Sequence, residues 1–365
     1  MPLTLSSLRR RFLQGVAGGG SVLLAGQLAQ TNESDDNGSG YDADRDDDLA
    51  PAQEPDVDRI AADPTDLPPP VDWDEPRRHE ITLRTEEHVA EIEPEVTYQY
   101  MTFEGRIPGP LIRVRRGDTI HLTFDVPDDR NALPHNIDFH AVYGPGGGAD
   151  DTTIAPGEGP VEIEFRAEYP GIFDYHCAVP NMDHHISSGM FGAILVEPED
   201  GLPEVDQELY FGQHELYTNG EAGDAGHHQV DFDAMVAENP TYVLLNGEAY
   251  AFAEDGPYGA VEAERGERVR IYYANGGPNL TAAVHPIGNV WETLYRDGSF
   301  GDAANWVETT PVTPGTVTAA ELDTPVPGPI KLVDHAITRT LRKGNLAAID
   351  VAGDPNESIY DPDPE

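Results

Sequence analysis

The sequence repeats a strand-like pattern after about 150 residues, and this repeat constrains the fold more than any other feature. The segment RRGDTIHLTF at 115–124 matches ERGERVRIYY at 264–273, and YPGIFDYHC at 169–177 loosely matches VPGPIKLVDH at 326–335. A duplication with this period indicates two copies of one structural unit. Any fold proposed for the chain must therefore contain the same strand arrangement twice.

Short segments of alternating polarity indicate what each copy contains. TIHLTF at 119–124 places Ile120, Leu122 and Phe124 on one face, and VEIEF at 161–165 alternates in the same way, as half-buried strands do. Long apolar helical stretches are absent, and the chain has 37 Gly and 32 Pro. We therefore predict an all-β protein of two tandem Greek-key β-sandwich domains, at 76–200 and 201–355.

The charge of the chain excludes one class of partner. Asp and Glu number 67 against 22 Lys and Arg, which gives a formal net charge of −45. Such a surface repels phosphate backbones, so we predict no nucleic-acid binding. An excess of carboxylates with few lysines also suits a protein that stays soluble in concentrated salt, and it predicts a halophilic source.

The N-terminal region predicts export. Arg9, Arg10 and Arg11 precede Phe12 and a weakly apolar segment, a pattern typical of a twin-arginine signal at 1–30, which carries folded proteins across a membrane. We expect a protein outside the cytoplasm, either free or associated with the cell surface. From Thr31 to Ile60 there are eleven acidic residues and two arginines, so 31–75 is predicted to be an acidic disordered linker. An acidic tail is expected at 356–365.

The single cysteine has the neighbours of a metal ligand. One thiol excludes an internal disulfide, and Cys177 is followed by His185 in a Cys-x7-His spacing and then by Met190. His135 lies about forty residues earlier. Two imidazoles, a thiolate and a long axial thioether are typical of an electron-transferring copper site, whereas zinc has little use for a thioether.

A second set of ligands follows from strand geometry. His176 directly precedes Cys177, and consecutive side chains of a strand point to opposite faces. The five-residue spacing of His135 and His140 also predicts opposite faces, whereas Asp138 and His140 share one. His140 and His176, with a carboxylate beside them, therefore form an incomplete metal site that needs at least one more ligand.

The missing ligand is expected from the second repeat. His335, in KLVDHA, occupies roughly the place of His176 and Cys177 and is the preferred candidate, and His285, in AVHPIG, corresponds to His135. The other candidates have weaker support, and His227 and His228, in the polar run EAGDAGHHQ, are expected on a surface loop.

The sequence resembles the copper-containing nitrite reductases, a family of two-domain cupredoxin proteins. The resemblance runs from about residue 80 and is densest in FEGRIPGPLIRV, PHNIDFHAVYGPGGG, PGIFDYHCAVPNMDHHISSGMFGAILV and AVHPIGNVW. It implies cupredoxin-like domains and two coppers per subunit. The type 1 copper is implied at His135, Cys177, His185 and Met190, and the catalytic type 2 copper at His140, His176 and His335.

The resemblance also implies how the two coppers are used. Asp138 and His285 become the acid and proton-relay pair, and Ile287 shapes the nitrite pocket. One electron from a small redox protein, such as a blue copper protein, would pass from type 1 to type 2 copper and reduce nitrite to nitric oxide. The family forms homotrimers, in which His335 completes the site of a neighbouring subunit. Two departures are His184, where relatives commonly carry Trp, and GNVW after Ile287, which lacks a second histidine.

Two alternative functions can be weighed against this one. A multicopper oxidase that reduces oxygen holds a trinuclear cluster with about eight histidines, usually in His-x-His pairs, and no His-x-His occurs in this chain. A non-enzymatic electron carrier would need only the type 1 set, which leaves Asp138, His140, His285 and His335 unexplained. One copper per chain would indicate a carrier, and two would indicate an enzyme.

Overall fold

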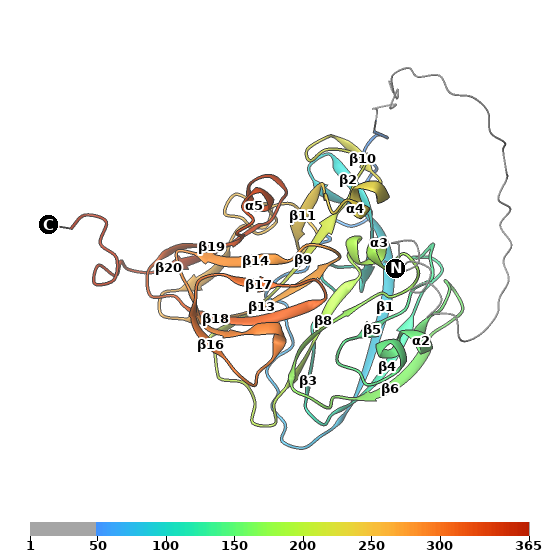
Figure 1. Ribbon diagram of the computed structural model, residues 1–365, viewed down its shortest axis with the longest axis horizontal. Helices are drawn as coiled ribbons and strands as arrows, with labels where there is room; N and C mark the ends of the chain where they lie inside the picture. Colours follow the sequence, from blue (N-terminus) through green and yellow to red (C-terminus); the bar gives the residue numbers. More distant parts are fainter. Residues whose placement is uncertain (1–48, 365) are drawn as a thin grey trace, which may run out of the picture. The chain divides into compact units, whose positions relative to one another are not determined.

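The computed structural model describes residues 49–364, so the twin-arginine segment expected at 1–30 and the linker up to residue 48 lie outside the described residues. Strands dominate, and the helices are short (Figure 1). None of the helices among the described residues has the length and apolarity needed to cross a bilayer.

The first half of the chain, joined by the short strand β10 from the second half, forms two sheets that face each other. One has the order β10-β2-β1-β4-β6 and the other β3-β8-β7-β5. The strands of the first sheet are β10 (Gly226–His228), β2 (Val96–Phe103), β1 (Arg78–Glu93), β4 (Thr119–Asp125) and β6 (Val161–Arg166). Those of the second are β3 (Ile112–Arg115), β8 (Phe191–Glu197), β7 (Gly171–His176) and β5 (Asp138–Phe139), and the helices are η1 (Pro145–Gly148), α2 (Ala149–Thr152) and α3 (Met182–Ser187).

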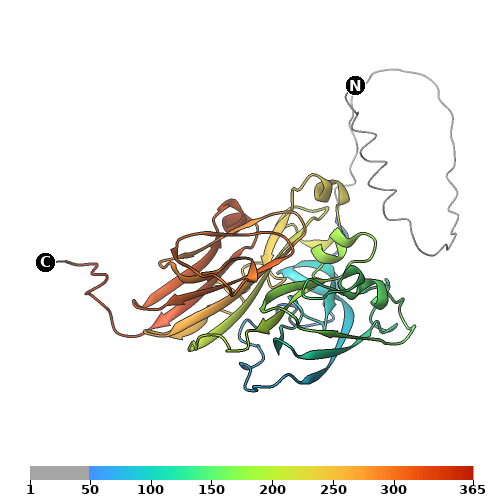
Figure 2. The same ribbon diagram turned by 60° about the horizontal axis from the view of Figure 1, so that its bottom comes forward.

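The second half forms a matching pair of sheets, with the orders β11-β9-β13-β18-β15-β16 and β12-β20-β19-β14-β17. Figure 2 shows the orange and red strands of this half gathered beside the blue and green strands of the first half. Its first sheet contains β11 (Tyr242–Leu245), β9 (Gln207–Leu216), β13 (Arg268–Gly277), β18 (Thr316–Asp323), β15 (Trp291–Tyr295) and β16 (Ala304–Val307). Its second contains β12 (Val261–Glu264), β20 (Leu346–Ala352), β19 (Gly328–Asp334), β14 (Ala282–Ile287) and β17 (Thr310–Val312), and its helices are α4 (Phe232–Val236), η2 (Arg296–Gly298) and α5 (Thr338–Arg342).

The pairing of strands confirms the duplication. The repeated segments 115–124 and 264–273 form most of β4 and the first part of β13. Strand β4 pairs in parallel with β1 and antiparallel with β6, and β13 pairs in the same way with β9 and β18. In the opposite sheets, β7 lies between β8 and β5, as β19 lies between β20 and β14. The predicted all-β fold of two related sandwiches is therefore correct.

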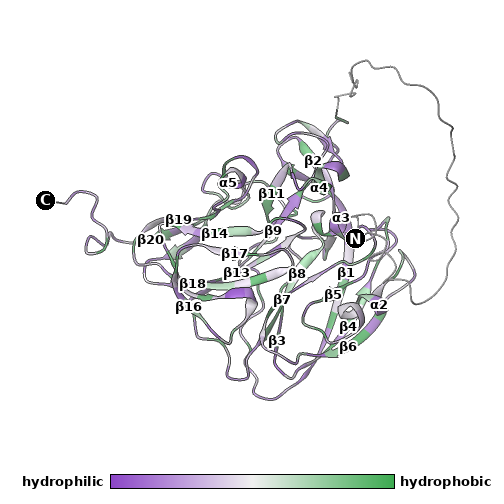
Figure 3. Cartoon of the chain, viewed as in Figure 1, coloured by the Kyte–Doolittle hydropathy of each residue, from purple (hydrophilic) through white to green (hydrophobic). Residues whose placement is uncertain are grey.

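Alternating burial fixes the faces of these strands. Ile120, Leu122 and Phe124 of β4 are buried while the residues between them stay partly exposed, as the sequence predicts. Each such apolar side chain contributes about 1.5–3 kcal/mol to folding. All seven residues of β8 are buried, although the last one is the charged Glu197. Figure 3 shows green, hydrophobic colouring along much of this strand. One face of β8 packs in the core of the first half and the other against the second half.

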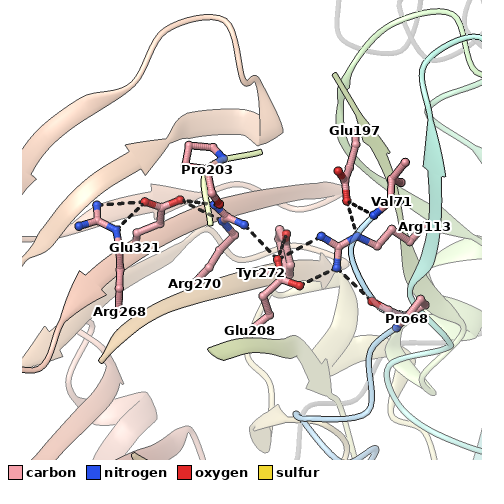
Figure 4. A network of polar contacts seen from close by, with 10 residues as sticks. All are labelled: Pro68, Val71, Arg113, Glu197, Pro203, Glu208, Arg268, Arg270, Tyr272 and Glu321. Carbon is pink, nitrogen blue, oxygen red and sulfur yellow. Dashed lines mark hydrogen bonds and ion pairs between the residues drawn. The ribbon is translucent and has the colours of Figure 1, made fainter. Parts of the chain in front are cut away.

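A buried ionic network also joins the two halves. Arg113 of β3 contacts Glu197 and Glu208, and Arg270 of β13 contacts Glu208 and Glu321, so Glu208 is shared between two guanidinium groups (Figure 4). The side chains of both arginines are at most 2% exposed. Because each buried charge has a partner of opposite sign, the network avoids the cost of an uncompensated ion.

Residues 49–75 differ from the expected disordered linker. Ile60 is fully buried, its N–H and that of Ala61 donate to Glu248 Oε1 at 3.0 Å, and Ile60 O accepts from Ile107 N at 3.0 Å. The acidic composition of the whole segment concealed the short apolar run from Ile60 to Ala62. The remaining domain limits stay predictions.

Candidate metal centre

Three donors converge inside the first half, at the end of the sheet that carries β5 and β7. His135 precedes β5, Cys177 follows β7, and His185 lies in α3. Cys177 Sγ lies 3.8 Å from His135 Nδ1 and 3.6 Å from His185 Nδ1, and the two imidazole nitrogens are 3.2 Å apart. All three residues are buried. We call them the first cluster.

Met190 belongs to the same loop. Its carbonyl accepts from Cys177 N at 3.2 Å, and its own N–H donates to His185 O at 3.1 Å. Its side chain is fully buried in the core of the first half, together with Cys177. The structure thus brings the four expected residues together; the axial role of the Met190 thioether stays a prediction.

Burial sets the charge state of the first cluster. It raises the pKa of the Cys177 thiol to about 11. Burial, with His135 and His184 adding to it, lowers the pKa of His185 to about 3. A neutral imidazole keeps a lone pair free, and a metal ion must displace the thiol proton to bind sulfur. Two imidazoles and one thiolate that converge in the buried interior fit copper, to which they would supply a trigonal set of strong donors.

Two residues that sequence reasoning missed hold this cluster in place. Asn136 Oδ1 accepts from Ala178 N at 2.6 Å and lies 3.7 Å from Cys177 Sγ, so it ties the segment after β7 to His135. Glu87 Oε1 lies 3.4 Å from His135 Nε2, which fixes the tautomer and leaves Nδ1 facing the sulfur. Adjacency to His135 could have indicated Asn136, whereas Glu87 comes from the distant strand β1.

The second half supports the loop that carries His185 and Met190. His214 of β9 donates from Nδ1 to Ser187 O at 2.8 Å, and Ser187 Oγ donates to Glu215 O at 2.6 Å. Burial lowers the pKa of His214 to about 4, so its ring stays neutral. No role for His214 was evident from the sequence.

A second set of donors lies on the other face of β7. Asp138, His140 and His176 bring one ligand atom each within 4.8 Å of one another, and we call them the second cluster. His140 Nε2 lies 3.1 Å from His176 Nε2, and Asp138 Oδ2 lies 4.0 Å from the same nitrogen of His176. The predicted alternation at His176 and Cys177 is therefore correct, since the two fall in different clusters.

The hydrogen bonds of His176 leave one nitrogen free for a metal. Its Nδ1 donates to Cys177 O at 3.0 Å, so Nε2 carries the lone pair. Burial lowers the pKa of His176, and the nearby His140 lowers it further. The hydrogen bond to the Cys177 carbonyl raises the pKa but does not outweigh these two effects. The Nε2 atom of His140 lies 3.1 Å from that of His176, so it either donates a hydrogen bond to this lone pair or, in the other tautomer, adds a second lone pair beside it. In the second case the two neutral imidazoles could hold a metal, and such borderline donors suit copper.

A glycine loop fixes Asp138. A Cβ at Gly147 would lie 2.0 Å from Asp138 Oδ1 and 2.7 Å from Phe139 O, and the φ of Gly147 is +58°. Only glycine allows the backbone this close, in this conformation. The run GPGGG at 144–148 was part of the resemblance, but its contact with the carboxylate could not be inferred from the sequence.

His285 and His335 lie together on the second half but apart from both clusters. Their ring centroids are 5.6 Å apart, and neither belongs to the two donor groups found among residues 49–364. His335 is exposed, and Ile287 nearby in β14 is 42% exposed. His285 Nδ1 donates to Glu308 O at 2.6 Å. The chain therefore presents this pair at its surface.

The ladders correct one correspondence between the repeats. Asp138 pairs with His176 across β5 and β7, and His285 pairs with Val333 across β14 and β19. Since β7 and β19 align from Gly171 and Gly328, His285 is equivalent to Asp138 and not to His135. The sequence comparison missed this because the repeats differ in length between these segments.

His227 and His228 are not on a surface loop, contrary to the expectation. They form β10, which pairs in parallel with β2 of the first half, and both are buried. His227 Nδ1 lies 3.1 Å from Thr97 Oγ1, and His228 Nδ1 lies 2.9 Å from Thr218 Oγ1. Their role is structural, and the polar sequence around them concealed a strand that completes a distant sheet.

Comparisons with known proteins agree with this geometry. A family model described as multicopper oxidase matches residues 70–200. A copper-containing nitrite reductase of Neisseria meningitidis serogroup B is 41% identical over 305 residues, which cover 84% of this chain and 77% of that protein. One from Rhizobium sullae is 33% identical over 302 residues, 78% of each chain.

A solved structure agrees as well. The copper nitrite reductase from Nitrosomonas europaea superposes with a TM-score of 0.68 at 32% identity, covering 76% of this chain and 95% of that one. Relatives at this identity and coverage share both halves of the fold and not one domain alone. The chain belongs to the family of copper-containing nitrite reductases, and copper is its cofactor.

Proposed function

We propose that this protein reduces nitrite to nitric oxide: one nitrite, one electron and two protons give one nitric oxide and one water. The observation that carries the proposal is that consecutive residues of one strand end, His176 and Cys177, belong to two different donor clusters. Copper bound there would supply one-electron redox chemistry at the first cluster and an open coordination position for nitrite at the second.

The two clusters are linked in two ways. The covalent backbone connects Cys177 to His176 directly, and the hydrogen bond from His176 Nδ1 to Cys177 O, 3.0 Å long, adds a second connection. Both residues are buried, so this path runs through the protein interior. This short path supports transfer of an electron from the first cluster to the second.

Two side chains are placed to handle protons. Asp138 is partly exposed and lies beside the second cluster, where it would donate a proton to the oxygen that leaves nitrite. His285 donates from Nδ1 to Glu308 O, so its Nε2 is free to exchange a proton through water. General acid catalysis of this kind contributes about 10²- to 10⁴-fold.

The exposed parts of the site support a shared location between subunits. His140 is exposed at the edge of the second cluster, in which residues 49–364 of one chain place two imidazoles and one carboxylate and no third imidazole. His335 is exposed among apolar side chains, with Ile337 43% and Leu341 67% exposed. In a homotrimer, His335 of one subunit would complete the cluster of the next, and Ile287 would line its nitrite pocket.

Copper content and product together test the reaction. The full-length protein, loaded with copper, should contain two coppers per chain and release nitric oxide from nitrite when a chemical reductant is supplied. One copper per chain without nitric oxide would indicate an electron carrier, and three coppers beyond the first cluster would indicate an oxidase.

Mixed subunits test the shared site. His140→Ala and His335→Ala chains should each be inactive alone. When the two chains are co-expressed, about one quarter of the sites should recover activity. A site is intact only where a chain that keeps His140 meets a neighbour that keeps His335, and each condition is met about half of the time. No recovery in proven mixed trimers would show that each site is built from a single chain.

The electron donor and the cellular location are further parts of the proposal. A net charge of −45 favours a small redox protein with a basic docking face, and docking of this kind weakens as salt is added. The paired arginines at the N-terminus support export by the twin-arginine route. Replacing Arg9, Arg10 and Arg11 with lysine should retain the protein in the cytoplasm if that signal is used.

A further inference from the structure

Asp334 occupies in the second half the place that Cys177 occupies in the first. Because His176 is equivalent to Val333 in the two ladders, the next residue along each chain is Cys177 in one half and Asp334 in the other. Both side chains are fully buried. The position that provides sulfur to the first cluster therefore provides a buried carboxylate beside His335.

The hydrogen bonds of this carboxylate hold the His285 segment, the His335 segment and α5. Asp334 Oδ1 accepts from Ala283 N at 3.1 Å and from Ala336 N at 2.9 Å, and Oδ2 accepts from Arg339 Nη1 at 2.6 Å. Ala283 lies two residues before His285, and Ala336 directly follows His335. The carboxylate thus bonds to both segments at once, and Arg339 neutralises its charge.

The His335 ring depends on this arrangement. Its backbone N–H donates to Ala283 O at 2.7 Å, but the hydrogen bonds among residues 49–364 include none to its ring. Arg339 also donates to Thr281 O at 2.7 Å, and Thr340 Oγ1 donates to Asp334 O at 2.9 Å, so α5 is joined to the same point. Apart from its contact with the His285 ring, the His335 ring is therefore positioned through its backbone.

We propose that Asp334, with Arg339 as its counter-ion, is the positioning residue that sets the distance between His285 and His335. The inference rests on the proposed function, in which His335 completes a neighbouring subunit's copper site and His285 exchanges protons beside it. A metal ligand must be held to within a few tenths of an ångström, and partners of ligands typically change metal affinity 10- to 100-fold when removed.

The test uses Asp334→Asn in the full-length protein. Asparagine keeps the size and one acceptor, but its amide N–H groups face Arg339. We expect copper affinity at the second cluster to fall about 10- to 100-fold and its electron paramagnetic resonance spectrum to change. The visible absorption of the thiolate-bound copper should stay the same, because Cys177 is in the other half. Arg339→Lys, which keeps the charge, should rescue most of the affinity compared with Arg339→Gln.

Glu321→Gln is the matched control. Glu321 is 2% exposed and is likewise paired with an arginine, Arg270, but it contacts neither histidine. It should lower the melting temperature and leave both copper signals unchanged. Equal loss of the second copper in Glu321→Gln and Asp334→Asn would overturn the inference, since it would then reflect general destabilisation.

His335→Ala separates this inference from the proposed function. If His335→Ala keeps the second copper, the proposed site itself is wrong. If His335→Ala loses that copper while Asp334→Asn keeps it with an unchanged spectrum, only the positioning role is wrong. Should Asp334→Asn fail to fold, the comparison of Arg339→Lys with Arg339→Gln decides the matter by the same spectrum.

Discussion

The two halves of the molecule share one strand topology but treat the end of one strand differently. In the first half, Cys177, His135 and His185 point at one another, and each holds a donor atom directed at the shared centre. In the second half, the carboxylate of Asp334 is satisfied by Ala283, Ala336 and Arg339. A buried position with unused donors can take a metal, whereas one whose donors are all used becomes a structural support.

The two halves also differ at a second pair of equivalent positions. Asp138 of the first half and His285 of the second are equivalent in register. We propose that both handle protons. They are held by different means: Asp138 by the close backbone of Gly147, and His285 by its hydrogen bond to Glu308 O. If halves of neighbouring subunits meet at the site, the duplication supplies both proton-handling groups from one ancestral position.

Cys177→Ala should give the largest effect and test whether the first half alone carries the electron-accepting site. Without the thiolate, we expect the loss of one copper per chain, of the visible absorption band, and of activity with a protein donor to the background rate. Metal analysis and absorption spectra measure this. Asp334→Ala, at the equivalent position, should leave that band intact; loss of the band in both variants would contradict the comparison.

Asp138→Asn and His285→Gln test the equivalent pair. Each should keep both coppers and lower turnover by about 10²- to 10⁴-fold, because each removes a proton donor. Steady-state rates of nitric oxide formation with a chemical reductant measure the loss. If the two groups act in one proton path, the double variant should lose little more than the worse single variant. Full activity in either single variant would remove that residue from the mechanism.

Glu208→Gln tests the ionic network that joins the halves. Burial raises the pKa of Glu208, but its bonds with Arg113, Tyr272 and Arg270 outweigh burial and lower the pKa overall. Removing the charge leaves two buried guanidinium groups with one partner fewer, which costs about 3–5 kcal/mol of unfolding free energy at pH 7.

The pH dependence of this cost has a definite sign. Because the folded pKa of Glu208 is lowered, its stabilisation is present above the unfolded value, about 4.3, and is lost as the pH falls through the folded value. The difference in stability between the wild type and Glu208→Gln should therefore shrink below about pH 4. Denaturant unfolding at several pH values measures it, and a constant difference would argue against the ionised network.

Gly147→Ala should give the smallest effect. The left-handed φ costs about 1–2 kcal/mol for any other residue, and the added methyl group displaces Asp138. We expect turnover to fall about 10-fold. Gly259→Ala is the matched control, because its φ is +73° but a Cβ there meets nothing within 4 Å. It should lose similar stability and keep full turnover; equal turnover in both variants would refute the contact with Asp138.

Local patterns predicted the strands and the donor sets. Alternation identified β4 and β6, and the spacing around the only cysteine grouped Cys177 with His185 and Met190. Parity alone separated His176 from Cys177. Each of these depends on neighbours in the chain, which a sequence displays directly.

Distant partners could not be predicted in this way. The burial of His227 depends on the pairing of β10 with β2, 130 residues earlier at Thr97. Ile60 is ordered by Glu248, 188 residues away. The contact of Gly147 with Asp138 and that of Glu87 with His135 are also tertiary. Such contacts are decided by the packed fold, so composition averaged over a segment conceals them.

Strand β10 has a consequence for dividing this protein. It comes from the second half of the chain but completes a sheet of the first, next to β2. A fragment that stopped near residue 200 would leave the edge of β2 that pairs with β10 exposed, and exposed strand edges promote aggregation. It would also leave Arg113 without Glu208. The duplication suggests two separable modules. A fragment that holds only the first domain and its electron-accepting site would nevertheless lose these contacts if the chain were cut at the boundary between the repeats.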